Sequence, residues 1–119
     1  MEKIDAVAAL AALAQANRLD VYRLLVQAGP EGMAAGEVAA ELDIAPNTLS
    51  FHFDRLRHAG LVSVARQGRS LIYAARYETM TNLLGYLTEN CCGGKPDLCA
   101  PVACPPSKPA RKRLRETVR

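Results

Sequence analysis

Apolar side chains recur every three or four residues along most of the first ninety positions, which is the spacing of amphipathic helices. The first such segment covers about residues 3–15, and its small-sided face suits close approach of another helix. A second helix is expected to begin at Asn17 as N-cap and to end at Gly29-Pro30. The predicted apolar stripe of this second helix is Leu19, Tyr22, Leu25 and Val26.

Two short helices follow, separated by a tight turn. The first is "GEVAAELD", and the second is "PNTLSFHFDRLRHAG", which ends at Gly60. Pro46 suits the first position of a helix because its missing N–H would have no partner there. The spacing of the second helix turns Leu49, Phe53 and Leu56 inward. The side chains left on or near its outer face are Asn47, Thr48, Ser50, Phe51 and His52.

The pattern then changes to that of strands. "LVSVAR" and "SLIYAAR" are β-prone runs joined by "QGR", which predicts a hairpin with Gly68 in its turn. A last helix, "YETMTNLLGYLTENC", is expected to end at Gly93-Gly94. Five of the seven prolines fall between Pro96 and Pro109. The chain therefore divides into a domain over residues 1–92 and a flexible, basic tail with prolines and cysteines over 93–119.

This order of elements is that of a winged helix-turn-helix domain, a mostly helical α+β fold (α-α-α-α-β-β-α). A helix that enters the major groove needs short hydrogen-bonding side chains near its N-terminus. Thr48, Ser50 and His52 meet that need, and Arg55 and Arg57 could reach phosphates. Singly, such residues are ordinary caps or solvated groups. Together with Arg66 and Arg69 at the hairpin tip, they predict binding to double-stranded DNA.

Charge and compartment agree with this interpretation. Residues 1–60 carry five Lys and Arg against eight Asp and Glu, whereas residues 61–119 carry ten against four. The basic groups concentrate in "ARQGRS" and in the final "RKRLRETVR", and such clusters favour a polyanionic partner. The N-terminal segment carries Glu2, Lys3 and Asp5 and lacks a cleavage-like end, so we expect neither a signal peptide nor a membrane span. These features predict a cytoplasmic protein.

The chain also resembles the ArsR family of bacterial metalloregulatory repressors over roughly residues 3–92. The resemblance is carried by "NRLDVYRLLVQAG", "GEVAAELDIAPNTLSFHFDRLRHAGLV" and "RQGRSLIYAA". It implies a homodimer that binds a twofold-symmetric operator, with Thr48, Ser50 and His52 where the family contacts DNA. Two positions differ from the family, with Pro46 where Gln is common and Phe51 where a polar residue is common. The dimer is expected to form through the first and last helices, with Val7, Leu10, Met80, Leu83, Leu84 and Leu87 at the interface.

All four cysteines lie within "ENCCGGKPDLCAPVACPP", and some arsenic-responsive members of the ArsR family resemble this arrangement. Trivalent arsenic is soft, prefers thiolate sulfur and binds three ligands. Cys91 and Cys92 are adjacent and can reach one large atom, while Gly93-Gly94 lets the chain reverse and bring Cys99 as third ligand. Cys104 is a substitute third ligand. The expected effector is arsenite, antimonite or methylated trivalent arsenic, with no cofactor required.

Other roles for the cysteines stay open. Four thiolates could hold zinc or another soft metal, although none of the spacings is the familiar C-x-x-C pair. They could instead form a redox-sensing disulfide, or have no function. Catalysis is disfavoured because these cysteines follow a helix instead of preceding one, and no Ser/His/Asp grouping offers another active site.

Overall fold

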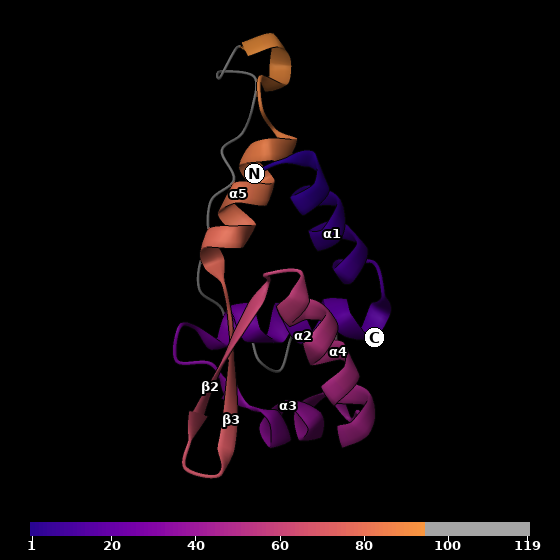
Figure 1. Ribbon diagram of the computed structural model, residues 1–119, viewed down its shortest axis with the longest axis vertical. Coiled ribbons are helices and arrows are strands. Elements are labelled where there is room, and N and C mark those ends of the chain that lie inside the picture. Colours follow the sequence, from indigo (N-terminus) through magenta and orange to yellow (C-terminus); the bar gives the residue numbers. More distant parts are fainter. Residues whose placement is uncertain (95–119) are drawn as a thin grey trace.

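The computed structural model describes residues 1–94, so most of the predicted tail lies outside the described residues. Its elements follow the order of a winged helix-turn-helix domain, as predicted, with a small three-stranded sheet beside the helices (Figure 1). The elements are α1 (Lys3–Leu13), α2 (Ala16–Ala28), β1 (Met33–Ala34), α3 (Ala35–Leu42), α4 (Pro46–His58), β2 (Val62–Gln67), β3 (Ser70–Ala75), α5 (Tyr77–Leu87) and a 3₁₀ turn (Cys91–Gly94).

The second helix begins earlier than predicted. Its N-cap is Gln15, whose side-chain oxygen accepts a hydrogen bond from the backbone N–H of Arg18 at 3.0 Å. The prediction of Asn17 as N-cap is therefore wrong, because Asn17 already lies inside the first turn of α2. The prediction for Pro46 is confirmed, since it is the first residue of α4.

The sheet has the strand order β1-β3-β2 with antiparallel pairing throughout. The register of β2 and β3 runs from Val62 opposite Ala75 to Gln67 opposite Ser70, which leaves a two-residue turn at the tip. Gly68 adopts a φ of 64° in that turn, a value that glycine reaches without steric cost. The short strand β1, which the sequence pattern did not predict, adds a third strand against Tyr73 and Ile72.

The core joins α4 to the sheet and to α2. The rings of Phe53 and Tyr73 stack with centroids 3.6 Å apart and planes within 3°. Leu49, Phe53 and Leu56 are buried, as predicted. In α2 the predicted stripe is only partly right, because Leu19 and Val26 are exposed. The α2 side chains that fill the core are Val21, Tyr22, Leu24 and Leu25.

Helix α1 packs its alanines against the rest of the domain and exposes its larger apolar side chains. Ala6, Ala9 and Ala12 are buried, and their small size lets α1 approach its neighbours closely. The exposed fractions of Ile4, Val7 and Leu10 are 75%, 57% and 43%. One face of α1 is therefore apolar and uncovered within the single chain.

Helix α5 ends at Leu87, so the prediction that it continues to the cysteines is wrong. The hydroxyl of Thr88 donates to the carbonyl of Leu84 at 2.7 Å, and Asn90 then turns the chain with a φ of 55°. Leu83 is only 2% exposed, which contradicts its predicted place in the dimer interface, because it is part of the core of its own chain. Met80 and Leu84 are partly buried, and Leu87 is 53% exposed.

Helices α1 and α5 pack against each other at the end of the molecule opposite the β2–β3 turn (Figure 1). Within residues 1–94 we find no helix long and apolar enough to cross a membrane.

Gly32 is the glycine whose replacement should damage the fold most. Its φ is 75°, and a Cβ there would lie 2.3 Å from the backbone oxygen of Tyr73. Because that oxygen belongs to the central strand, Gly32→Ala should lower the free energy of unfolding by about 2–4 kcal/mol, measured by urea denaturation. Gly36→Ala is the control, since nothing lies within 4 Å of its added Cβ. It should be neutral or stabilising by about 0.5 kcal/mol, and equal losses in both variants would contradict this account.

Candidate nucleic-acid interface

The outer face of α4 presents a set of polar side chains and one aromatic ring. Burial of Leu49, Phe53 and Leu56 fixes the rotation of the helix about its axis. As a result Asn47, Thr48, Ser50 and Phe51 are exposed, as the sequence predicted. Such a face matches the donors and acceptors on base edges in the major groove.

His52 does not belong to this face, and the prediction that it does is wrong. Its side chain is 5% exposed, and its Nδ1 lies 3.4 Å from a guanidinium nitrogen of Arg18. An arginine can only donate, so Nδ1 accepts and the neutral ring carries its proton on Nε2. Burial, and to a smaller extent the Arg18 charge, lower the pKa of His52 below its ordinary value. His52 therefore positions α4 from inside the protein.

Arg18 joins three helices at this point, a role that sequence reasoning missed. Its Nε donates to the carbonyl of Ala12 at 2.7 Å, and its backbone N–H is capped by Gln15. Together with the contact to His52, these bonds connect the end of α1, the start of α2 and the middle of α4. A positive charge in the first turn of a helix interacts unfavourably with the helix dipole. The presence of Arg18 there is a signal in the sequence that its side chain has a role in tertiary contacts.

Phe51 and Arg55 lie one turn apart and contact each other. The guanidinium carbon of Arg55 is 5.6 Å from the centroid of the Phe51 ring, within the range of a cation–π interaction. The Phe51 ring also meets His52 edge to face, with centroids 5.8 Å apart and an interplanar angle of 61°. Phe51 is nevertheless 56% exposed.

Arg57 is engaged in a different way. It pairs with Asp54 at 3.5 Å on the exposed surface of α4. Such a surface pair is worth less than about 1 kcal/mol, so Arg57 can exchange Asp54 for a phosphate at little cost.

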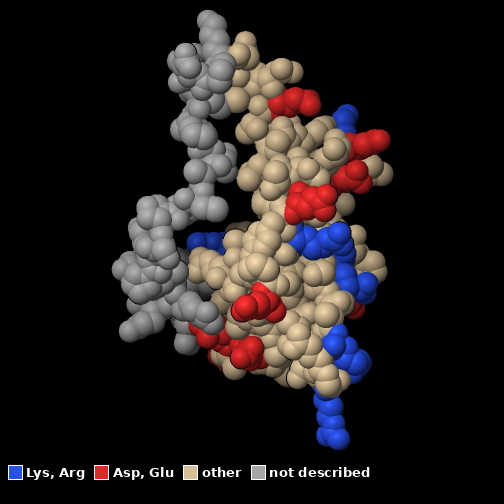
Figure 2. Space-filling model, turned by 90° about the vertical axis from the view of Figure 1, so that its left-hand side faces the viewer, with Lys and Arg blue, Asp and Glu red and all other residues tan. Residues whose placement is uncertain are grey.

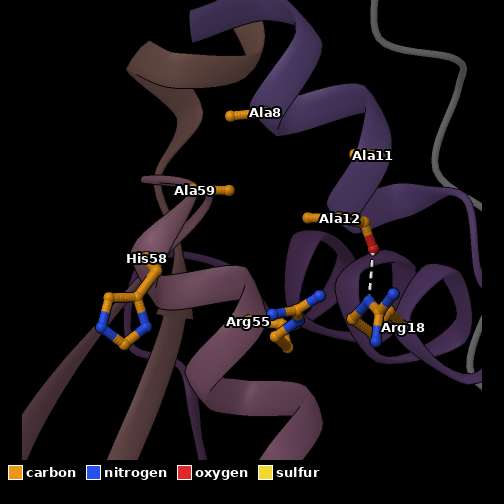
Figure 3. A pocket seen from close by; sticks show the side chains of 7 residues that line it. All are labelled: Ala8, Ala11, Ala12, Arg18, Arg55, His58 and Ala59. Carbon is orange, nitrogen blue, oxygen red and sulfur yellow. Dashed lines mark hydrogen bonds between the residues drawn. The ribbon is translucent and has the colours of Figure 1, made fainter.

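A hollow of about 340 Å³ lies beside α4, between that helix and α1 (Figure 3). Arg18 and Arg55 extend toward one another along it, and the small side chains of α1 form the opposite side. Its lining residues are Ala8, Ala11, Ala12, Arg18, Arg55, His58 and Ala59.

The hairpin of β2 and β3 forms the wing. Arg66 and Arg69 flank Gly68 and are exposed, as predicted. Figure 2 shows basic side chains along one edge of the molecule and projecting at its lower end, where Figure 1 places the hairpin turn. The wing thus offers positive charge that can contact a DNA backbone.

The described cysteines lie far from this interface. Cys91 opens the 3₁₀ turn beyond α5, is partly buried, and donates its backbone N–H to the carbonyl of Thr88 at 2.9 Å. Cys99 and Cys104 lie outside the described residues. Among the residues that the structure describes, no three potential ligand side chains come together as a metal site. The three-cysteine site therefore stays a prediction.

The buried His52 should make stability depend on pH. In the unfolded chain its pKa is about 6.5, and in the fold it is lower, so below pH 6.5 the unfolded state binds more protons. The contribution of His52 to the free energy of unfolding should therefore decrease by at most about 1.4 kcal/mol per pH unit as the pH drops below 6.5. Urea denaturation of wild type and His52→Gln at pH 7.5 and 5.5 measures the effect. The wild type should lose more stability on acidification than His52→Gln, and equal losses would contradict this account.

Comparisons with known proteins agree with this geometry. A helix-turn-helix domain family matches residues 13–65. The HTH-type transcriptional regulator YceK of Bacillus subtilis, itself uncharacterized, is 36% identical over 77 residues, which cover 64% of this chain and 76% of YceK. The crystal structure of an ArsR family transcriptional regulator is 26% identical with a TM-score of 0.65, covering 76% of this chain and 90% of that one.

A second similar structure is a homodimeric winged helix-turn-helix DNA-binding domain from Mycobacterium bovis. It is 21% identical with a TM-score of 0.59, covers 76% of this chain and 84% of its own, and so shares the fold. The relatives are regulators of transcription, not enzymes. The chain belongs to the ArsR family of winged helix-turn-helix transcriptional regulators.

Proposed function

We propose that this protein is a homodimeric, cytoplasmic repressor that binds an operator of an arsenic-resistance operon and releases it when trivalent arsenic or antimony binds its C-terminal cysteines. The observation that carries the proposal is the position of Cys91. It lies just beyond α5, at the end of the molecule formed by α5 and α1. A ligand bound there acts on the helices that we expect to form the dimer and leaves the DNA-binding face untouched.

DNA binding is assigned to α4 and the wing. In this proposal α4 enters the major groove, and the wing contacts the adjacent backbone. His52 is left out because it is buried, and the contacts come from residues with exposed side chains. These are Asn47, Thr48, Ser50, Phe51, Arg55, Arg66 and Arg69.

The dimer is assigned to the uncovered apolar face of α1 and to the exposed end of α5. Ile4, Val7 and Leu10 are too large and too exposed to stay in water without cost, and burial of such side chains drives association. Leu87, with the partly buried Met80 and Leu84, extends the face along α5. The similar domain from Mycobacterium bovis is homodimeric, and the choice of α1 and α5 for this chain rests on their exposed apolar side chains.

The effector site is assigned to Cys91, Cys92 and Cys99. Three thiols satisfy the pyramidal coordination of trivalent arsenic, and sulfur is the donor that this soft centre prefers. Cys91 lies in the 3₁₀ turn that follows α5, while Cys99 and its substitute Cys104 belong to the segment that follows the described residues. Ligation would draw that segment toward the end of α5.

Helix α5 offers a route from the cysteines to α4. At its start, the Thr79 hydroxyl donates to the carbonyl of Gly60 at 2.6 Å, and Arg76 N–H donates to the carbonyl of Leu61 at 2.8 Å. Gly60 and Leu61 directly follow α4, so a shift of α5 is passed to the recognition helix. A coupling of about 1–3 kcal/mol between the two sites would weaken operator binding roughly 5- to 150-fold.

Arsenite should release the operator, and the release should require the cysteines. Fluorescence anisotropy of labelled upstream DNA with reduced, full-length protein should show release at low micromolar arsenite. Cys91→Ser, Cys92→Ser and Cys99→Ser should each abolish release, whereas Cys104→Ser should reduce it little. At neutral pH arsenite is uncharged As(OH)₃, and three thiols replace its hydroxides with release of water only. The affinity of the protein for arsenite should therefore change little between pH 6 and 7.5. Release by zinc or by an oxidant, with none by arsenite, would contradict the arsenic assignment.

A charge on the apolar face of α1 should disrupt the dimer. Leu10→Glu should raise the dimer dissociation constant at least about tenfold, because burying an unpaired carboxylate is costly. Analytical ultracentrifugation over a range of protein concentrations measures this constant. Leu19→Glu is the matched control, since Leu19 on α2 is 44% exposed against 43% for Leu10. Equal weakening by both variants would exclude α1 as the specific interface.

A further inference from the structure

Phe51 is the one large apolar side chain that α4 exposes. The other exposed residues along this helix are polar, charged or, at its first position, proline. With 56% of its surface in contact with water, the ring contributes little to the core. At the centre of a polar surface assigned to DNA, an exposed aromatic ring is able to contact an apolar group on a base edge.

Two neighbouring side chains contact the ring. His52, itself anchored by Arg18, meets it edge to face, and the Arg55 guanidinium lies near its face. A side chain ordered in advance loses less conformational entropy when it binds. Phe51 is thus presented to the solvent as a fixed apolar surface with a cation beside it.

Asn47, Phe51 and Arg55 are spaced four residues apart, so they form one ridge along the exposed side of α4. In the major groove, an asparagine suits adenine and an arginine suits guanine or a phosphate. The apolar group that the major groove offers is the C5-methyl of thymine. The middle member of the ridge is therefore complementary to thymine.

We propose that Phe51 is a specificity-determining residue that contacts the C5-methyl group of one thymine in each operator half-site. The proposal rests on the assignment of α4 as the recognition helix. Its signature is a preference for thymine over uracil, which the polar residues of the ridge cannot supply because the two bases differ only in this methyl group. Burial of one methyl group changes affinity about fourfold, so two half-sites together give about 15-fold.

The test begins with the full-length, reduced dimer and a selection of binding sites from random double-stranded DNA. Synthetic duplexes of the selected site then carry deoxyuridine in place of one thymine pair at a time, placed symmetrically in the two half-sites. Anisotropy titrations compare wild type, Phe51→Gln and Phe51→Leu on each duplex. For the wild type, replacement of one symmetric thymine pair by deoxyuridine should lower the affinity for the duplex about 15-fold.

The variants decide whether Phe51 is responsible. Phe51→Gln should bind the duplex with thymine and the duplex with deoxyuridine at that pair with equal affinity. Phe51→Leu should keep part of the difference in affinity between the two duplexes, because leucine is also apolar. The proposal is overturned if no thymine pair matters to the wild type, or if Phe51→Gln keeps the full wild-type difference. A selection that enriches no sequence would instead refute the function proposed for α4. Because Phe51 is exposed, both variants should retain the wild-type melting temperature. If Phe51→Gln does not fold, Phe51→Leu decides the test, because it should show a smaller difference between the two duplexes than the wild type.

Discussion

The guanidinium group of Arg18 links α4, the proposed recognition helix, to α1, the helix assigned to the dimer. It donates to the last turn of α1 through Ala12 and contacts the ring of His52 in α4. Hydrogen bonds from a charged donor are worth about 1.5–3 kcal/mol, and here they link elements whose facing side chains are small. A twofold operator is matched only if both copies of α4 hold a set orientation. The proposed orientation of the polar surface of α4 therefore depends on a partly buried contact behind that surface.

Local patterns sufficed for much of the fold. Pro46, Gly68 and the inward side of α4 were predictable because each depends on neighbours in the sequence. His52 was misplaced because its polarity suggested the surface, although residues 49, 52, 53 and 56 share one helical face. The Arg18 contact spans 34 residues and leaves no local signal. Strand β1 is too short for any alternating pattern, and Leu83 could not be assigned to core or interface by spacing alone.

The protein separates its two proposed tasks along its length. The wing lies at one end, and the 3₁₀ turn with Cys91 lies at the other (Figure 1). Helix α5 connects them, since its first turn bonds to the residues after α4 and its last turn leads to the cysteines. A small displacement of one rigid helix is enough to transmit a signal between sites that share no residue, provided that the helix has two arrangements of similar energy.

The alanine face of α1 has a consequence for how firmly that helix is held. Ala6, Ala9 and Ala12 bury little area each, so apolar burial adds little to the docking of α1 beyond the hydrogen bond from Arg18 to Ala12. The larger side chains, Ile4, Val7 and Leu10, are stabilising only when a second copy covers them. Order in α1 then rises with protein concentration by mass action. We therefore expect α1 to loosen before the rest of the domain in dilute protein, and exposure of the loosened segment to proteases would link the lifetime of the regulator to its own abundance.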